Sequence, residues 1–361
     1  MGRGGSPGKH DIGKETDRME EFNYQNQYAD RTVTPERMRE VRAMLDTPVL
    51  RGPVMEFDDR YTDCPSVFRY RGGWYMIFIA ISKDTRVSGY ETHLAVSDDL
   101  LRWRYAGPLL CRDPGREWDS KQIAGYAALY DPAVGGGCAL STYGDRYWMT
   151  YLAGASDGYE PDPLLMGIAS ARDPLDPQSY IREDKPILTP ADPDARFFET
   201  RTLYKSTVIR DEERLTGHDF VMCYNAKAYD GHERIYMAVS DDMVRWTRYG
   251  RYPIVDDITG DPDCYITADP MILRDRDGLY IMNIMKFNRS RSAFDTFACS
   301  YDLIHWTEWL GTPTMAPSAD DPNQDVYAHK PWIVTWEGHV YHFYCACTKD
   351  NRRYIALATD F

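Results

Sequence analysis

The chain has 361 residues, 56 acidic and 42 basic side chains, and a formal net charge of -14. This negative charge argues against a nucleic-acid-binding surface, and no apolar stretch reaches the roughly 18 residues that a membrane-spanning helix needs. The N-terminal segment lacks the apolar core of a secretory signal, which favours a cytoplasmic location.

Residues 1–51 are predicted to be an N-terminal extension with one short helix. Residues 1–30 are polar and contain several glycines, so we expect them to be partly disordered. A helix is predicted within residues 32–47, because Thr34 suits the N-cap position and Pro35 suits the first helical position.

The predicted helix carries an apolar stripe formed by Met38, Val41 and Leu45. Such a stripe has to be buried, either on the rest of this chain or on a partner subunit. The second alternative predicts a homodimer through the helix.

A repeated element follows the extension. LAVSDDLLRW (94–103), MAVSDDMVRW (237–246) and FACSYDLIHW (297–306) are clear copies, and GIASARDPLD (167–176) and IALATDF (355–361) are weaker ones. Their anchor residues are Ser97, Ser170, Ser240, Ser300 and Thr359, so consecutive copies are 59 to 73 residues apart. Five units therefore fill most of the chain.

Each unit contains short apolar runs rich in aromatic and β-branched residues, separated by turn signals such as RGG, GDR and WEG. A four-stranded antiparallel sheet of this size cannot cover both of its own faces, and packing several sheets around an axis solves this problem. The repeat predicts an all-β fold, a five-bladed β-propeller over residues 52–361. The tryptophans of the repeat are then interpreted as scaffold, whereas other aromatic residues fit either the core or a sugar-binding cleft.

The innermost strand of each unit is expected to begin at the mouth of a central funnel. Several ionisable residues stand there, next to a landmark proline or its equivalent: Asp63, Asp131, Lys205, Asp269, His329 and Lys330. Burial alone does not account for ionisable groups at these positions.

Residues 52–361 resemble the five-bladed propeller glycoside hydrolases. Two features carry this resemblance: the repeated element, and Asp63, the acidic residue at the opening of the first unit. This superfamily includes families 43, 32, 68 and 117, and the YxHKPW…YHFYCA end is most similar to family 117. The resemblance implies an exo-acting, inverting hydrolase that removes a terminal sugar of anhydro-galactose or furanoside type from an oligosaccharide.

The resemblance implies that Asp63 is the general base and that Asp269 is a second functional aspartate, which tunes the pKa of the acid or holds the sugar. Inverting hydrolysis needs two carboxyl groups that flank the bond, and residues from different blades can supply them. A structural alternative exists for both residues, because aspartate before proline is also common at turns and strand starts.

Two residues are candidates for the general acid. Glu199 lies just before the third inner strand, where family 43 places its acid, and His329 matches a functional histidine of family 117. That family has a glutamate beside the histidine, whereas this chain has Lys330. His329 has an alternative role as the ligand of a water or a metal on the axis.

Further side chains are predicted to contact the substrate: Asp119, Lys205, Lys330, Tyr204 and Trp332. The two lysines neutralise the carboxylates or bind an acidic sugar. Glu91 and Glu233 are aligned at one position of the repeat, and a repeated residue is interpreted as structural.

No cofactor is required by this chemistry, although a central Ca²⁺, Mg²⁺ or Zn²⁺ at His329 is compatible with the sequence. The eight cysteines lack zinc-finger spacing and are interpreted as buried thiols. Two other functions stay open: a non-catalytic carbohydrate-binding propeller, and a glycoside phosphorylase that uses Lys205, Lys330 and Arg201 for phosphate.

Overall fold

The computed structural model describes residues 32–289 and 292–361. The disorder predicted for residues 1–30 lies outside these residues. The regular structure of the described chain consists of strands, a few short 3₁₀ helices and one α-helix, α2 (Pro35–Met44), which confirms the all-β prediction. None of the described helices is long and apolar enough to cross a membrane.

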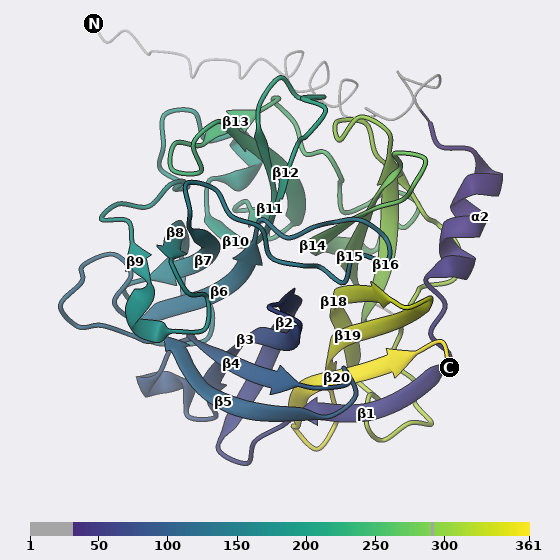
Figure 1. The fold of residues 1–361 in the computed structure, drawn as a ribbon, viewed down its shortest axis with the longest axis horizontal. Coiled ribbons are helices and arrows are strands. Elements are labelled where there is room, and N and C mark those ends of the chain that lie inside the picture. Colours follow the sequence, from purple (N-terminus) through teal and green to yellow (C-terminus); the bar gives the residue numbers. More distant parts are fainter. Residues whose placement is uncertain (1–31, 290–291) are drawn as a thin grey trace, which may run out of the picture.

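The strands form one 12-stranded sheet and two four-stranded sheets. We divide them into groups of strands that pair antiparallel with their neighbours, and within the 12-stranded sheet two single parallel bridges join one group to the next. The groups are β2 (Arg60–Tyr70), β3 (Gly73–Ser82), β4 (Glu91–Ser97) and β5 (Trp103–Leu110); β6 (Gln122–Ala128), β7 (Tyr147–Gly154), β8 (Leu165–Ala171) and β9 (Ile181–Arg182); β10 (Thr202–Arg210), β11 (Phe220–Lys227), β12 (Glu233–Ser240) and β13 (Thr247–Tyr249); β14 (Cys264–Arg274), β15 (Tyr280–Asn288), β16 (Ser292–Ser300) and β17 (Thr307–Glu308); and β18 (Tyr327–Trp336), β19 (His339–Cys347) and β20 (Arg353–Thr359) with β1 (Val49–Met55). The sheets surround a common centre (Figure 1).

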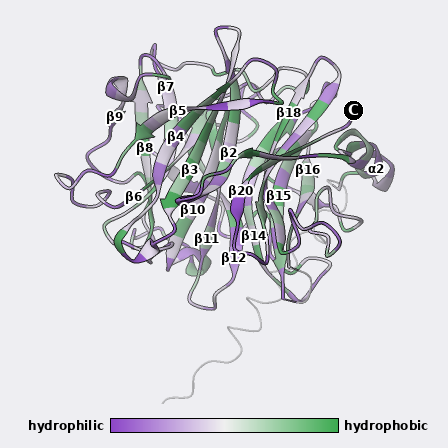
Figure 2. Cartoon of the chain, turned by 90° about the horizontal axis from the view of Figure 1, so that it is seen from below, coloured by the Kyte–Doolittle hydropathy of each residue, from purple (hydrophilic) through white to green (hydrophobic). Residues whose placement is uncertain are grey.

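Strand β1, the first strand of the described chain, pairs antiparallel with the last strand, β20. The boundary predicted between residues 51 and 52 falls inside this strand. The last group is therefore built from both ends of the chain. Hydrophobic residues are concentrated along the strands of all the sheets (Figure 2).

The repeated element is a capped turn. In the third group the Ser240 hydroxyl accepts from the N–H groups of Asp242 and Met243, and Met243 is left-handed, with a φ of 63°. The indole Nε1 of Trp246 donates to the Met243 carbonyl at 2.8 Å. The same hydrogen bond joins Trp306 to the Leu303 carbonyl, so the tryptophans of the repeat close this turn.

The inner strands carry a β-bulge next to the landmark proline. The register shifts in β2, β14 and β18 at the residues that precede Pro65, Pro270 and Pro331. These residues, Cys64, Asp269 and Lys330, have φ values of 48°, 56° and 65°. A left-handed non-glycine residue is uncommon, and such residues cluster at functional sites.

Helix α2 begins as predicted, with the Thr34 side chain accepting from the Arg37 N–H and with proline at the start. Its apolar residues Met38, Val41 and Leu45 are buried in the main hydrophobic cluster of this chain. Arg37 forms ion pairs with Asp275 and Asp277 next to β14. The apolar face is thus covered by the chain itself, and the reason for expecting a homodimer through this helix is removed.

Candidate active site

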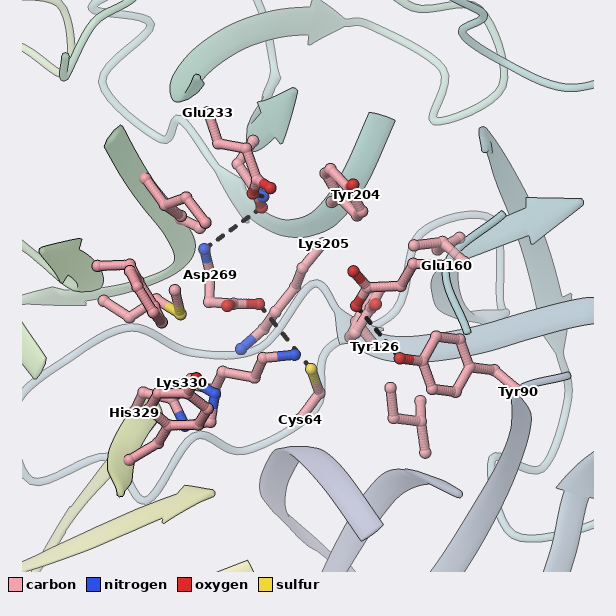
Figure 3. Close-up of a pocket in the computed structure, with 18 of the residues that line it drawn as sticks. Cys64, Tyr90, Tyr126, Glu160, Tyr204, Lys205, Glu233, Asp269, His329 and Lys330 are labelled. Carbon is pink, nitrogen blue, oxygen red and sulfur yellow. Dashed lines mark hydrogen bonds between the residues drawn. The ribbon is translucent and has the colours of Figure 1, made fainter. Parts of the chain in front are cut away.

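A pocket of about 720 Å³, including its solvent-filled mouth, lies where the strand groups meet. Residues from every group line it, and Figure 3 shows most of the polar ones pointing towards one another. The ionisable and amide lining residues are Cys64, Tyr90, Tyr126, Tyr159, Glu160, Tyr204, Lys205, Asn225, Glu233, Asp269, Tyr327, His329, Lys330 and Arg353.

Five of the predicted site residues line this pocket: Asp269, Lys205, Lys330, Tyr204 and His329. The bulges explain the positions of Asp269 and Lys330, because each bulge adds one residue and re-aims a side chain at the start of an inner strand. Lys205, Asp269, His329 and Lys330, four of the ionisable residues expected at inner-strand openings, line this one pocket, whereas Asp131 is exposed and lies outside its lining.

Asp63 lies just behind the pocket wall and is 3% exposed. Its Oδ2 accepts from Lys330 Nζ at 3.0 Å and from the guanidinium of Arg353. Although burial alone raises the pKa of Asp63, the charges of Arg353 and Lys330 hold it well below its usual range. A carboxylate that is held by two cations and has such a low pKa is a weak base. This environment suits a residue of a structural ion pair better than the general base expected from the sequence.

Glu233 is the buried acid of the pocket. It stands at the start of β12, where its carboxylate accepts from Asn225 Nδ2 at 3.0 Å and pairs with Lys227 Nζ at 2.9 Å. Burial raises the pKa of Glu233 to about 7, the charges of Glu160 and Asp269 act in the same direction, and Lys227 opposes them. A pKa near neutrality is typical of a general acid.

A raised pKa does not by itself identify this acid. Burial also raises the pKa of Glu308 to about 7, and Glu308 pairs with Lys286 outside the pocket. Glu233 differs from Glu308 because it lines the cavity and shares it with a second glutamate.

That second glutamate, Glu160, comes from the connection between β7 and β8. It is half-buried, and the hydroxyl of Tyr90 donates to its Oε1 at 3.2 Å. Tyr90 and Glu160 both line the pocket, as does Glu233. Two glutamates from different strand groups thus face one cavity, and glycoside hydrolysis commonly uses such a pair of carboxyl groups.

Lys205 supplies an unpaired cation. Its Nζ is buried without a hydrogen-bond partner in the part of the chain that the structure describes, and it lies 5.9 Å from the centre of the Trp332 ring. Because a buried ammonium without a hydrogen-bond partner is costly, the position favours an anionic group in the ligand.

Glu199 is placed elsewhere. It ends the short 3₁₀ helix η4 (Phe197–Glu199), is fully buried and is not part of the pocket lining. Its carboxylate is held by Arg196, by Arg248 Nε at 2.5 Å and by the Tyr224 hydroxyl at 2.6 Å. These bonds fasten η4 to the third group and keep the Glu199 carboxylate away from the pocket, where the sequence led us to expect a general acid.

Asp119 and Trp332 also lie outside the pocket lining. Asp119 is fully buried and accepts from Arg116 Nε at 2.6 Å and from the Tyr151 hydroxyl at 3.0 Å. Trp332 is fully buried, and its Nε1 donates to the Val67 carbonyl at 2.8 Å. Both side chains tie strands together and do not reach the space that a sugar would occupy.

His329 reaches the pocket, but its imidazole is neutral at pH 7 and is not available there as a cationic acid. Burial lowers the pKa of His329 to about 3, and the charges of Lys330 and Arg353 lower it further. Its Nδ1 lies 2.9 Å from the Cys345 carbonyl oxygen. This environment does not suit a general acid, whereas a neutral imidazole can bind a metal or hold a water.

Three important residues, Glu160, Glu233 and Arg353, are not among the site residues predicted from the sequence. Glu233 looks like the repeat partner of Glu91, yet it precedes Ser240 by seven residues, whereas Glu91 precedes Ser97 by six. In a strand, an offset of one residue moves a side chain to the other face. Counting back from the serine reveals the difference, but nothing in the sequence marks Glu160 or Arg353.

No family model and no curated protein matches this chain. Among solved structures, one described as a glycoside hydrolase is 37% identical, with a TM-score of 0.84, and the match covers 91% of this chain and 96% of that one. A complex of BT0996 with RGII gives the same values. Zg3597, a family 117 glycoside hydrolase from Zobellia galactanivorans, is 12% identical, has a TM-score of 0.58 and is covered over 91% of its length, and so shares the fold.

These matches confirm the resemblance to the propeller-type glycoside hydrolases. The identity and the nearly complete coverage extend it from the fold to the family. The chain belongs to the glycoside hydrolases and is a glycosidase.

Proposed function

We propose that this glycosidase removes a terminal sugar from an oligosaccharide, with Glu233 as the general acid and Glu160 as the second carboxylate. The observation that carries the proposal is that both glutamates line one cavity while Glu233 has a pKa raised to about 7. In this scheme the Glu233 carboxyl protonates the departing oxygen, and Glu160 acts on the other side of the sugar. Asp269 and Tyr204 contact the sugar.

We further propose that the strand groups are the blades of a closed five-bladed propeller. Two observations support closure: β1 completes the last sheet, and Trp332 on β18 bonds to Val67 on β2, which joins the last group to the first. Because residues from every group surround the cavity, it fits the end of a sugar chain better than a chain that passes through. This supports exo-action.

The BT0996 structure is a complex with RGII, which makes RGII oligosaccharides the first substrates to test. We expect the purified enzyme to release one monosaccharide from these, or from oligosaccharides ending in an anhydro-galactose or a furanose, as detected by mass spectrometry. Glu160→Gln should lower the rate about 10²-fold or more. Asp157→Asn, a change on the same connection outside the pocket lining, should leave the rate unchanged.

Release of internal fragments would contradict exo-action, and an unchanged rate for Glu160→Gln would remove Glu160 from the scheme. Inversion stays a prediction from the sequence. Proton NMR of the first product tests it, because the anomer formed initially keeps or changes the configuration of the substrate.

Lys205 predicts that the substrate carries an anionic group, such as a uronic acid carboxylate. Replacing Lys205 by Met should raise KM for an acidic substrate about 10- to 100-fold, the usual value of a hydrogen bond to a charged group. The matched control is the same oligosaccharide with its carboxyl group reduced to an alcohol, for which the variant and the wild type should have equal KM.

An equal KM change for both substrates would contradict the assignment of Lys205 to an acidic sugar. The same ammonium could instead bind inorganic phosphate, as a glycoside phosphorylase requires. Formation of a sugar phosphate when phosphate is added would favour that second function over hydrolysis.

A further inference from the structure

Three potential metal ligands lie together in the last strand group. His329 on β18 is the cross-strand neighbour of Cys345 on β19, and Cys347 follows two residues later on the same face. All three are buried, and their ligand atoms lie within 4.8 Å of one another. Among residues 32–289 and 292–361, this is the one group of three or more His, Cys, Asp or Glu side chains with such close ligand atoms.

The donor set is chemically specific. Two thiols and one imidazole are the ligands that Zn²⁺ takes from proteins, at about 2.3 Å for sulfur and about 2.0–2.1 Å for nitrogen. Ligand atoms around such an ion lie roughly 3–4 Å apart, so small side-chain rotations would close the site. Nδ1 of His329 is engaged with the Cys345 carbonyl at 2.9 Å, which leaves Nε2 as the ligand nitrogen. A hydrogen bond from the other ring nitrogen commonly orients a metal-binding histidine.

The surrounding charges are compatible with a divalent cation. Asp63, Lys330 and Arg353 are the charged groups nearby, and they form an ion-paired cluster with one excess positive charge. Binding of a dication by two cysteines releases two thiol protons, so the net charge of the region stays the same. The two cations therefore do not exclude a metal.

We propose that His329, Cys345 and Cys347 bind one Zn²⁺ in the wall of the pocket, with water as the fourth ligand. The site lies where the last group packs on the first, since Cys345 Sγ is 3.8 Å from the Thr62 carbonyl oxygen on β2. Because His329 lines the pocket, the metal would fix the orientation of that ring. The ion has a positioning role, and the proposal does not depend on the reaction catalysed.

The test uses the full chain, purified under reducing conditions, with Zn²⁺ and Co²⁺ as probes. We expect about one zinc per chain by elemental analysis after dialysis, and a thiolate-to-cobalt charge-transfer band after substitution with Co²⁺. Cys345→Ser/Cys347→Ser should lose both signals, and His329→Gln should bind zinc at least 10-fold more weakly. Cys299→Ser is the matched control, because it removes a buried thiol outside the cluster and should retain both signals.

Thermal unfolding of each variant, with and without zinc, shows whether it is folded. Zinc should raise the Tm of the wild type and of Cys299→Ser, and should not raise that of the double variant. The proposal is overturned if the reduced wild-type chain binds no zinc, if binding survives in the double variant, or if Cys345 and Cys347 resist reduction as a disulfide and exclude the metal.

Discussion

Replacing Glu233 by Gln is expected to lower kcat by about 10²- to 10⁴-fold, the usual contribution of a general acid. Gln keeps the size of the side chain and its hydrogen bond with Asn225, but it cannot transfer a proton to the departing oxygen. The loss should be largest for natural oligosaccharides and much smaller for aryl glycosides with acidic leaving groups, because those depart without protonation. Steady-state kinetics on both substrate types measures this difference.

The pH dependence follows from the same group. Because burial raises the pKa of Glu233 to about 7, the protonated form predominates below that pH, and kcat of the wild type should fall as the pH rises through about 7. The stability of the fold should also decrease as the pH rises, for the same reason. A carboxyl whose pKa is raised on folding contributes stability at pH values below its unfolded pKa, and this contribution is lost as the pH rises through about 7.

Glu308→Gln is the matched control for this experiment. Glu308 is a buried glutamate with a pKa also raised to about 7 and a lysine partner, but it lies outside the pocket lining. Its replacement should alter stability and leave kcat and its pH profile unchanged. If both variants lose kcat equally, or if Glu233→Gln keeps full activity on natural substrates, Glu233 is not the acid.

Replacing Asp63 by Asn is expected to destabilise the protein by about 3–5 kcal/mol, because it leaves two buried cations without their carboxylate. Lys330 and Arg353 both bond to the same oxygen of Asp63, and all three residues lie in or behind the pocket wall. Chemical denaturation measures the loss. Activity should fall as well, because Lys330 and Arg353 are then free to move or to repel each other.

Asp131→Asn is the control, since Asp131 also precedes a landmark proline but is exposed and accepts from the Ala133 N–H. Its replacement should change the unfolding free energy by less than about 0.5 kcal/mol, as is usual on a surface. If Asp63→Asn keeps wild-type stability and loses only turnover, Asp63 acts as the base that the sequence suggested.

The depressed pKa of Asp63 also means that its stabilising effect is present above its unfolded pKa and is lost only as the pH falls through its very low folded pKa.

Much of the scaffold could be predicted from local sequence. The serine, aspartate and tryptophan of the repeated turn bond to backbone groups within three residues of themselves, so the pattern is visible along the chain. The N-cap of α2 is equally local. The openings of the inner strands could also be found, because proline marks them and ionisable residues stand beside it.

The partners of those ionisable residues could not be found in this way. Asp63 and Arg353 are 290 residues apart, and the pairing that holds them depends on how the last strand group packs on the first. For Glu199 the sequence was misleading. Its place just before an inner strand predicted a side chain in the pocket, whereas its bonds to three other residues direct its carboxylate into the third group.

The sequence by itself determined the repeated strand units, the all-β fold and a set of ionisable residues at the inner strand openings, because hydrophobic periodicity and turn chemistry act over a few residues. Only the tertiary structure decided which carboxylates face the cavity and which are neutralised. Whether a carboxylate serves as an acid or an anchor depends on burial and on the charges around it, and at Glu233 and Asp63 part of that environment comes from distant parts of the chain.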